Sequence, residues 1–225
     1  MRLVLTPDWF LGNDVLIGIF SFLVLATFFI LCLRNYKISK KKDFLYLGFG
    51  FLAISLAQLA AILTKLVLYY DTTFTQQIGE MVITYHVLSS VDILYQLGFF
   101  FNKFLMLLGF FIIYKIFNKS KKGDLFIVIY FIVLSALISS MIYHLYHLSL
   151  IMVLILIISN YYELYKKNNS ENTRILIYAF SILLLSNCIF MFSGISSLFV
   201  LADVLELVSY IILLLLIIRI LKFNN

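Results

Sequence analysis

Proline, tryptophan, cysteine and charged residues are all scarce in this chain. Its 225 residues include one Pro, one Trp and two Cys, and only 12% of them are charged. A soluble domain carries about 25% charged residues, and disordered, collagen-like or disulfide-stapled chains need charge, proline or cysteine that this chain lacks. Cys32 and Cys188 both lie inside apolar runs, where a thiol behaves as a small hydrophobic group, so we expect no redox chemistry.

Hydrophobic residues, by contrast, make up 64% of the chain, and the mean hydropathy is +1.07. A helix needs about 20 apolar residues to cross a hydrocarbon core of about 30 Å. Seven runs of roughly that length follow one another, over residues 14–33, 44–70, 91–117, 125–143, 147–165, 174–193 and 198–221. The runs are continuous and lack the alternation of a barrel. We therefore predict an all-α fold, a single multi-pass domain of seven transmembrane helices over residues 1–225 of a cell-membrane protein.

The basic residues predict the orientation of these helices. Fourteen of the 17 Lys and Arg residues follow spans one, three, five and seven or lie in the loops after them, whereas the opposite ends hold only Arg2. Because short loops rich in Lys and Arg stay in the cytoplasm, we expect the N-terminus outside and the C-terminus inside. The net charge of +6 thus belongs to loops and predicts no nucleic-acid partner.

Two segments at the predicted outer surface have a distinct character. Apolar residues recur at helical spacing over about residues 75–90, which predicts an amphipathic helix lying on the membrane surface. The opening PDWFLG of residues 7–12, followed by Asp14 and the first span, resembles uncharacterised small archaeal seven-helix membrane proteins. That resemblance covers about the first quarter of the chain and implies no activity.

Polar side chains inside the predicted spans are the candidates for function, because an ionisable group at mid-depth costs about 2.5–3.5 kcal/mol. Counted from the span ends, almost all of them fall in the outer half of the membrane or near its midplane, whereas the inner halves are nearly pure Leu, Ile, Phe and Val. We predict that they line an outward-facing polar pocket that binds a ligand. The candidate ligand-binding residues are Gln58, Lys65, Asp92, Gln96, Lys103, Asn187, Asp203, Glu206 and Tyr210.

The charges in this set suggest how they would pair. Lys103 would be neutralised by Glu206 or Asp203, and Lys65 would take another carboxylate. Two lysines against three carboxylates leave one negative charge, which suits a bound cation, a proton or a protonated acid. Each residue also has a plainer interpretation, such as Lys65 reaching the headgroups or Asp92 capping a helix.

Three histidines raise the alternative of a zinc site. His144 and His147 are three residues apart on one predicted helix, and His86 and Asp92 would complete the ligand set. Together with Ser140, this pattern is similar to membrane hydrolases of the adiponectin-receptor and alkaline-ceramidase type. In that family, however, the Ser-His pair lies in the second helix and two histidines in the seventh, whereas here the pair is in the fourth span and the seventh has no histidine.

Seven spans with an outside N-terminus also resemble opsins. Their retinal needs a lysine in the seventh helix, and the seventh span here has none before Lys222, so we do not expect retinal. The leading hypothesis is a non-enzymatic receptor or sensor for a small ligand, an ion or a lipid headgroup. The alternatives are a zinc-dependent intramembrane hydrolase and a structural or scaffolding membrane protein.

Small residues recur along the second span at Gly50, Ala53, Ala57 and Ala61. Such a stripe lets a neighbouring helix approach closely. We expect it to form a seam within the bundle first and a homo-oligomer interface second, with membrane lipids as the remaining partners.

Overall fold

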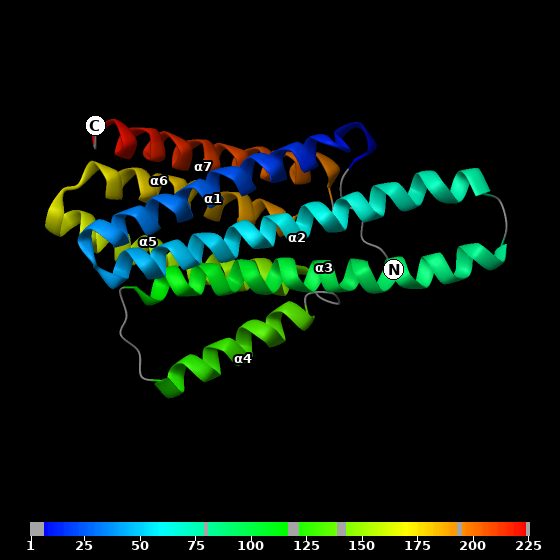
Figure 1. The fold of residues 1–225 in the computed structure, drawn as a ribbon, viewed down its shortest axis with the longest axis horizontal. Helices are drawn as coiled ribbons and strands as arrows, with labels where there is room; N and C mark the ends of the chain where they lie inside the picture. Colours follow the sequence, from blue (N-terminus) through cyan, green and yellow to red (C-terminus); the bar gives the residue numbers. More distant parts are fainter. Residues whose placement is uncertain (1–6, 79–80, 117–121, 139–142, 193–194, 224–225) are drawn as a thin grey trace.

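The computed structural model describes residues 7–78, 81–116, 122–138, 143–192 and 195–223. In these ranges the chain is helical, which confirms the predicted all-α class (Figure 1). A short 3-10 helix precedes seven α-helices: η1 (Asp8–Phe10), α1 (Asn13–Ser39), α2 (Lys42–Ile78), α3 (Met81–Lys115), α4 (Lys122–Ile138), α5 (Tyr143–Asn168), α6 (Glu171–Phe190) and α7 (Ser196–Phe223).

Six of the helices form a closed ring. Helix α1 packs on α2, α2 on α3, α3 on α5, α5 on α6, α6 on α7, and α7 returns to α1. Helix α4 lies outside this ring, against α3 and α5, and slants away from the other helices (Figure 1). Because α4 carries the chain back, α3 and α5 run parallel where they pack together.

The six ring helices are also the six that are long and apolar enough to cross a membrane. Their candidate spans are Asn13–Ser39, Lys42–Val67, Ile93–Lys115, His144–Asn168, Glu171–Phe190 and Ser197–Leu221. The 17 residues of α4 reach only about 25 Å at 1.5 Å per residue, and the predicted fourth span continues into residues outside the described ranges. The described part of the chain is therefore a helical bundle with six candidate membrane spans, which is consistent with a multi-pass membrane protein.

The predicted surface helix over residues 75–90 falls on the facing ends of two long helices. Residues 75–78 belong to the 37-residue α2, which ends at Ile78, and residues 81–90 to the 35-residue α3, which begins at Met81. Both extend well past the other helices as an antiparallel hairpin (Figure 1). The described residues of this segment are thus helical, and their place on the membrane surface stays a prediction.

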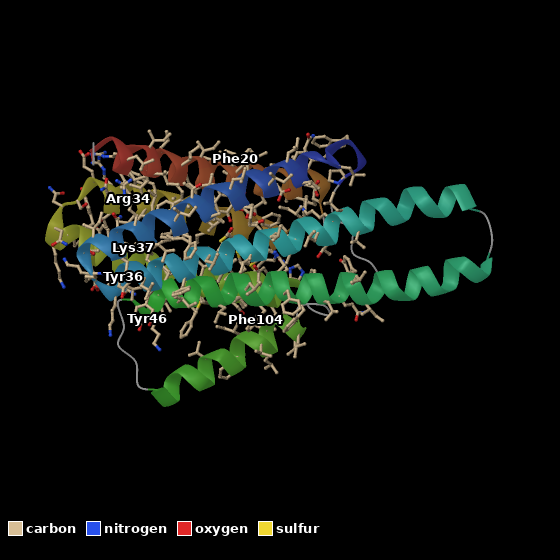
Figure 2. The ribbon with its side chains drawn as sticks, in the orientation of Figure 1. Phe20, Arg34, Tyr36, Lys37, Tyr46 and Phe104 are labelled. Carbon is tan, nitrogen blue, oxygen red and sulfur yellow. The ribbon has the colours of Figure 1, made fainter. Side chains whose placement is uncertain are left out.

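Basic residues gather at one end of the ring, which we call the basic end. The chain turns there from α1 to α2 and from α5 to α6, and α3 and α7 end there. Arg34, Tyr36 and Lys37 are labelled at this end in Figure 2. Arg219 of α7 pairs there with Glu171 at the start of α6. The chain turns at the other end, which we call the opposite end, from α6 to α7 and through the hairpin of α2 and α3.

Apolar side chains fill the centre of the ring and also cover its outside. Phe110 and Phe180 are 1% exposed and meet edge to face in the core. Leu16, Leu23, Ile30, Leu63 and Leu215 are each more than half exposed on the outer surface. A large apolar exterior is what a bundle surrounded by lipid needs.

Helices α2 and α3 meet along the predicted stripe of small residues. A Cβ added to Gly109 would lie 2.7 Å from the backbone oxygen of Gly50, so the two glycines allow contact between backbones. Nearby, Asn102 donates a hydrogen bond of 2.8 Å to the carbonyl of Ala57. The stripe is thus a seam within the bundle, as predicted.

Candidate functional site

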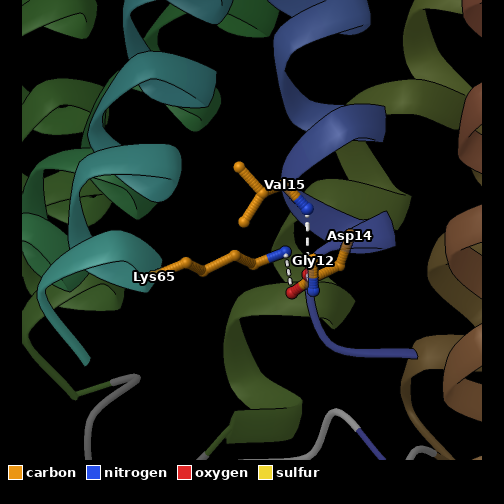
Figure 3. Close-up of polar contacts among 4 residues, drawn as sticks. All are labelled: Gly12, Asp14, Val15 and Lys65. Atoms are coloured by element: carbon orange, nitrogen blue, oxygen red, sulfur yellow. Dashed lines mark hydrogen bonds and ion pairs between the residues drawn. The ribbon is translucent and has the colours of Figure 1, made fainter. Parts of the chain in front are cut away.

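The first element of the site is an ion pair between α1 and α2. Gly12 has a φ of 90°, a conformation suited to glycine, and turns the chain into α1. Two residues on, Oδ1 of Asp14 accepts the backbone N–H groups of Gly12 and Val15, at 3.1 and 2.9 Å. Its Oδ2 is 3.0 Å from Nζ of Lys65 (Figure 3). Asp14 therefore satisfies the helix terminus with one oxygen and the lysine with the other.

The second element is a hydrogen-bonded triad between α2 and α7. Nε2 of Gln58 donates to Oε1 of Glu206 at 2.8 Å and lies 3.1 Å from the hydroxyl of Tyr210. The Tyr210 hydroxyl donates to the same Glu206 oxygen at 3.0 Å. Gln58 is 8% exposed and Tyr210 1%, so Glu206 receives two neutral donors inside the bundle.

Lys103 extends this triad towards α3 and α5. Its Nζ lies 3.9 Å from the ring centre of Tyr146 and 5.2 Å from that of Phe99, which are cation–π distances. Glu206 attracts the ammonium of Lys103 electrostatically, whereas Lys65 repels it. Lys103 is thus within electrostatic range of Glu206, and Tyr146 adds an aromatic face.

The fifth and sixth helices contribute a neutral pair. Nδ1 of His147 lies 3.0 Å from Oδ1 of Asn187, whose Nδ2 donates to the carbonyl of Leu183 at 2.9 Å. His147 is 3% exposed and within electrostatic range of Lys103. The pair closes the side of the site formed by α5 and α6.

Asp203 is the remaining acid, one turn before Glu206 on α7. It is 7% exposed, and the charges that act on it are Lys65, Glu206 and Asp14. Within the described ranges its buried Oδ2 has no hydrogen-bond donor. Because Lys65 and Asp14 of the ion pair and Glu206 of the triad all act on Asp203, this residue connects the two elements electrostatically.

We call these nine residues the polar cluster. All six ring helices contribute to it: Asp14, Gln58, Lys65, Lys103, His147, Asn187, Asp203, Glu206 and Tyr210. It occupies the half of the bundle away from the basic end. At its outer limit Lys65 pairs with Asp14, the second residue of α1, and at its inner limit Glu206 lies ten residues after the start of α7 at Ser196. At 1.5 Å per residue the cluster reaches from the rim to about 15 Å, roughly the middle of a hydrocarbon core.

The structure differs from the sequence prediction at Gln96. Gln96 is exposed and does not join the cluster in the part of the chain that the structure describes. The spacing predicted that Gln96 and Lys103 share one face of α3. The two residues are two helical turns apart, however, and at Gln96 this face extends past the contact with α5. The side chains of Asp92 and His86 lie outside the described residues.

Asp14 and Tyr146 were missed by the sequence analysis. Asp14 was named only beside the opening PDWFLG segment, yet its side chain is 0% exposed. Its signal was the glycine directly before α1, which lets an acid in the first turn fold back on the helix terminus. Tyr146 gave no signal, because an aromatic residue near a span end is common in any membrane protein.

The zinc hypothesis rests on residues that the structure places in different surroundings. His144 is exposed, whereas His147 is buried against Asn187. Among the described residues, no three His, Cys, Asp or Glu side chains form a group that could hold a metal ion. The third predicted ligand, His86, belongs to the side chains outside that description.

Comparisons with protein-family models, curated proteins and solved structures found no match to this chain. The functional argument therefore depends on the cluster itself.

Proposed function

We propose that the chain is a non-enzymatic receptor or sensor whose polar cluster binds a small ligand, an ion or a lipid headgroup. The single observation that carries this proposal is the convergence of ionisable side chains from α1, α2, α3 and α7 inside an apolar bundle. Charged groups at membrane depth are rare because they are expensive, and they usually mark a binding site or a pathway.

The position of the cluster supports access from one side. Lys65, which is 32% exposed, lies at the rim beside Asp14 at the start of α1, and the buried Gln58 and Tyr210 lie further in. In the other half of the ring the core is apolar, with Leu213, Leu216 and Ile217 each about 2% exposed. A ligand would enter at the opposite end and stop near the middle of the bundle.

The proposal includes the orientation and the number of spans. Basic residues at one end of the ring favour a cytoplasmic location for that end, with the N-terminus outside and the C-terminus inside. Helix α4 serves as a seventh span beside α3 and α5. The cluster then opens outwards, where a receptor would meet its ligand.

Cysteine accessibility in membrane vesicles of known sidedness tests the proposal. Single cysteines replace Lys65, Glu206 or Leu213 in a background carrying Cys32→Ala and Cys188→Ala. A charged, membrane-impermeant thiol reagent should modify positions 65 and 206 from the face opposite the basic end. Position 213, seven residues further along α7 in the apolar core, is the matched control and should not react.

Reaction of position 206 only from the face of the basic end would contradict the proposed site, as would no reaction at positions 65 and 206 from either face. Both results would mean that water does not reach the cluster from its rim.

A further inference from the structure

The carboxylate of Asp203 differs from the other acids of the cluster in its partners. Asp14 receives two backbone N–H groups and Lys65, and Glu206 receives the donors of Gln58 and Tyr210. Oδ2 of Asp203 is buried with no donor in reach among the described residues. A buried oxygen of this kind is costly while it carries charge, because water is excluded and nothing replaces it.

The neighbours of Asp203 do not neutralise it. From α2, Lys65 attracts it, but that ammonium is already 3.0 Å from Asp14 of α1. Glu206 on its own helix and Asp14 both repel it. On α6, the hydroxyl of Ser186 donates its hydrogen bond to the carbonyl of Ala202 and not to Asp203.

The charge balance indicates what would complete the site. With all groups ionised, the cluster holds the carboxylates of Asp14, Asp203 and Glu206 and the ammonium groups of Lys65 and Lys103. The net charge of the cluster is then −1. One additional positive charge brings the net charge to zero, whereas a divalent ion would bring it to +1.

We propose that Asp203 is the residue of the polar cluster that binds a single monovalent cation, either a proton or Na⁺. This inference rests on the proposed function and names the ligand of the same site. The bound charge replaces the missing donor at Oδ2 and stabilises the packing of α7 on α1 and α2.

Thermal unfolding of the purified full chain in detergent tests this inference. The Tm is measured in NaCl and in N-methyl-D-glucamine chloride at equal ionic strength, each at mildly acidic and at alkaline pH. A cation that binds only the folded chain raises the Tm, by at least about 2 °C where binding is near saturation. If the cation is a proton, acidification raises the Tm and Na⁺ has no effect; if it is Na⁺, the Tm rises with Na⁺ at alkaline pH.

The variant Asp203→Asn should lose this dependence, because the neutral amide needs no cation. Asp43→Asn is the matched control, since Asp43 is an exposed acid at the basic end, and it should behave as the unmodified chain does. Equal dependence of the Tm on pH and Na⁺ in the unmodified chain and in Asp203→Asn would overturn the inference, as would no dependence in either.

A second variant covers the case in which Asp203→Asn does not fold. Asp203→Glu keeps the carboxylate, so it should keep the dependence with a shifted midpoint in pH or in Na⁺ concentration. An unchanged midpoint would overturn the inference. If the Tm measurements overturn this inference but positions 65 and 206 react with the aqueous thiol reagent, the proposed function still stands. If positions 65 and 206 do not react, the proposed function itself is contradicted.

Discussion

Replacing Asp14 with Asn should separate the ion pair from the helix terminus. The amide oxygen of Asn can still accept the N–H groups of Gly12 and Val15, so only the charge that holds Lys65 is lost. Removing one partner of a fully buried pair costs about 3–5 kcal/mol, whereas an exposed pair contributes about 0–1 kcal/mol. Asp14 is fully buried and Lys65 is 32% exposed, so we expect a loss of about 1–3 kcal/mol.

A double-mutant cycle measures this coupling directly. The free energy of unfolding in mixed micelles is compared for Asp14→Asn, Lys65→Met and the double variant. The double variant should be more stable than the sum of the single effects predicts, with a coupling of about 1–2 kcal/mol. Lys37→Met, at an exposed lysine of the basic end, is the control and should show no coupling to Asp14→Asn. A coupling between Asp14 and Lys65 below about 0.3 kcal/mol would refute the pairing on which the rim of the cluster depends.

Three further changes test other contacts, each by the free energy of unfolding in the same micelles. Tyr210→Phe removes a donor from Glu206 and should cost about 0.6–1.7 kcal/mol, the range of hydrogen bonds between membrane helices; no loss would mean that the triad is not formed. Gly109→Ala places a Cβ 2.7 Å from a backbone oxygen of α2 and should cost about 1–3 kcal/mol, so an unchanged stability would contradict the close seam. Arg219→Ala removes the pair with Glu171 at the basic end, where both side chains are at least a third exposed; the loss should stay below about 1 kcal/mol and shrink in high salt, and a larger, salt-independent loss would speak against it.

Hydrophobic runs were sufficient to predict the helical class and the approximate spans. The first predicted span began at residue 14 and α1 begins at Asn13, and the last ended at residue 221, two residues before α7 ends at Phe223. Such boundaries can be found because each helix must match the thickness of the bilayer whatever its neighbours are.

The contacts within the cluster could be predicted only in part. The depth of each polar residue follows from its position in a span, which is why Gln58, Lys103 and Glu206 were recognised as one group. Their partners depend on the order of helices in the ring, and sequence distance does not reveal that α1 lies between α2 and α7. Asp14 was therefore missed as the partner of Lys65.

Cysteine cross-linking between α2 and α7 tests the central claim most directly, because Gln58 and Glu206 are 148 residues apart in the sequence and meet only if the ring closes as described. In the background free of native cysteines, Gln58→Cys with Glu206→Cys should be joined in the membrane by a short bis-maleimide cross-linker, because two long side chains that meet at 2.8 Å leave the shorter cysteine side chains too far apart for a direct disulfide. Leu63→Cys with Glu206→Cys is the control and should not, because Leu63 is 55% exposed on the outside of α2. A cross-link in the control pair, with none between positions 58 and 206, would contradict the polar cluster.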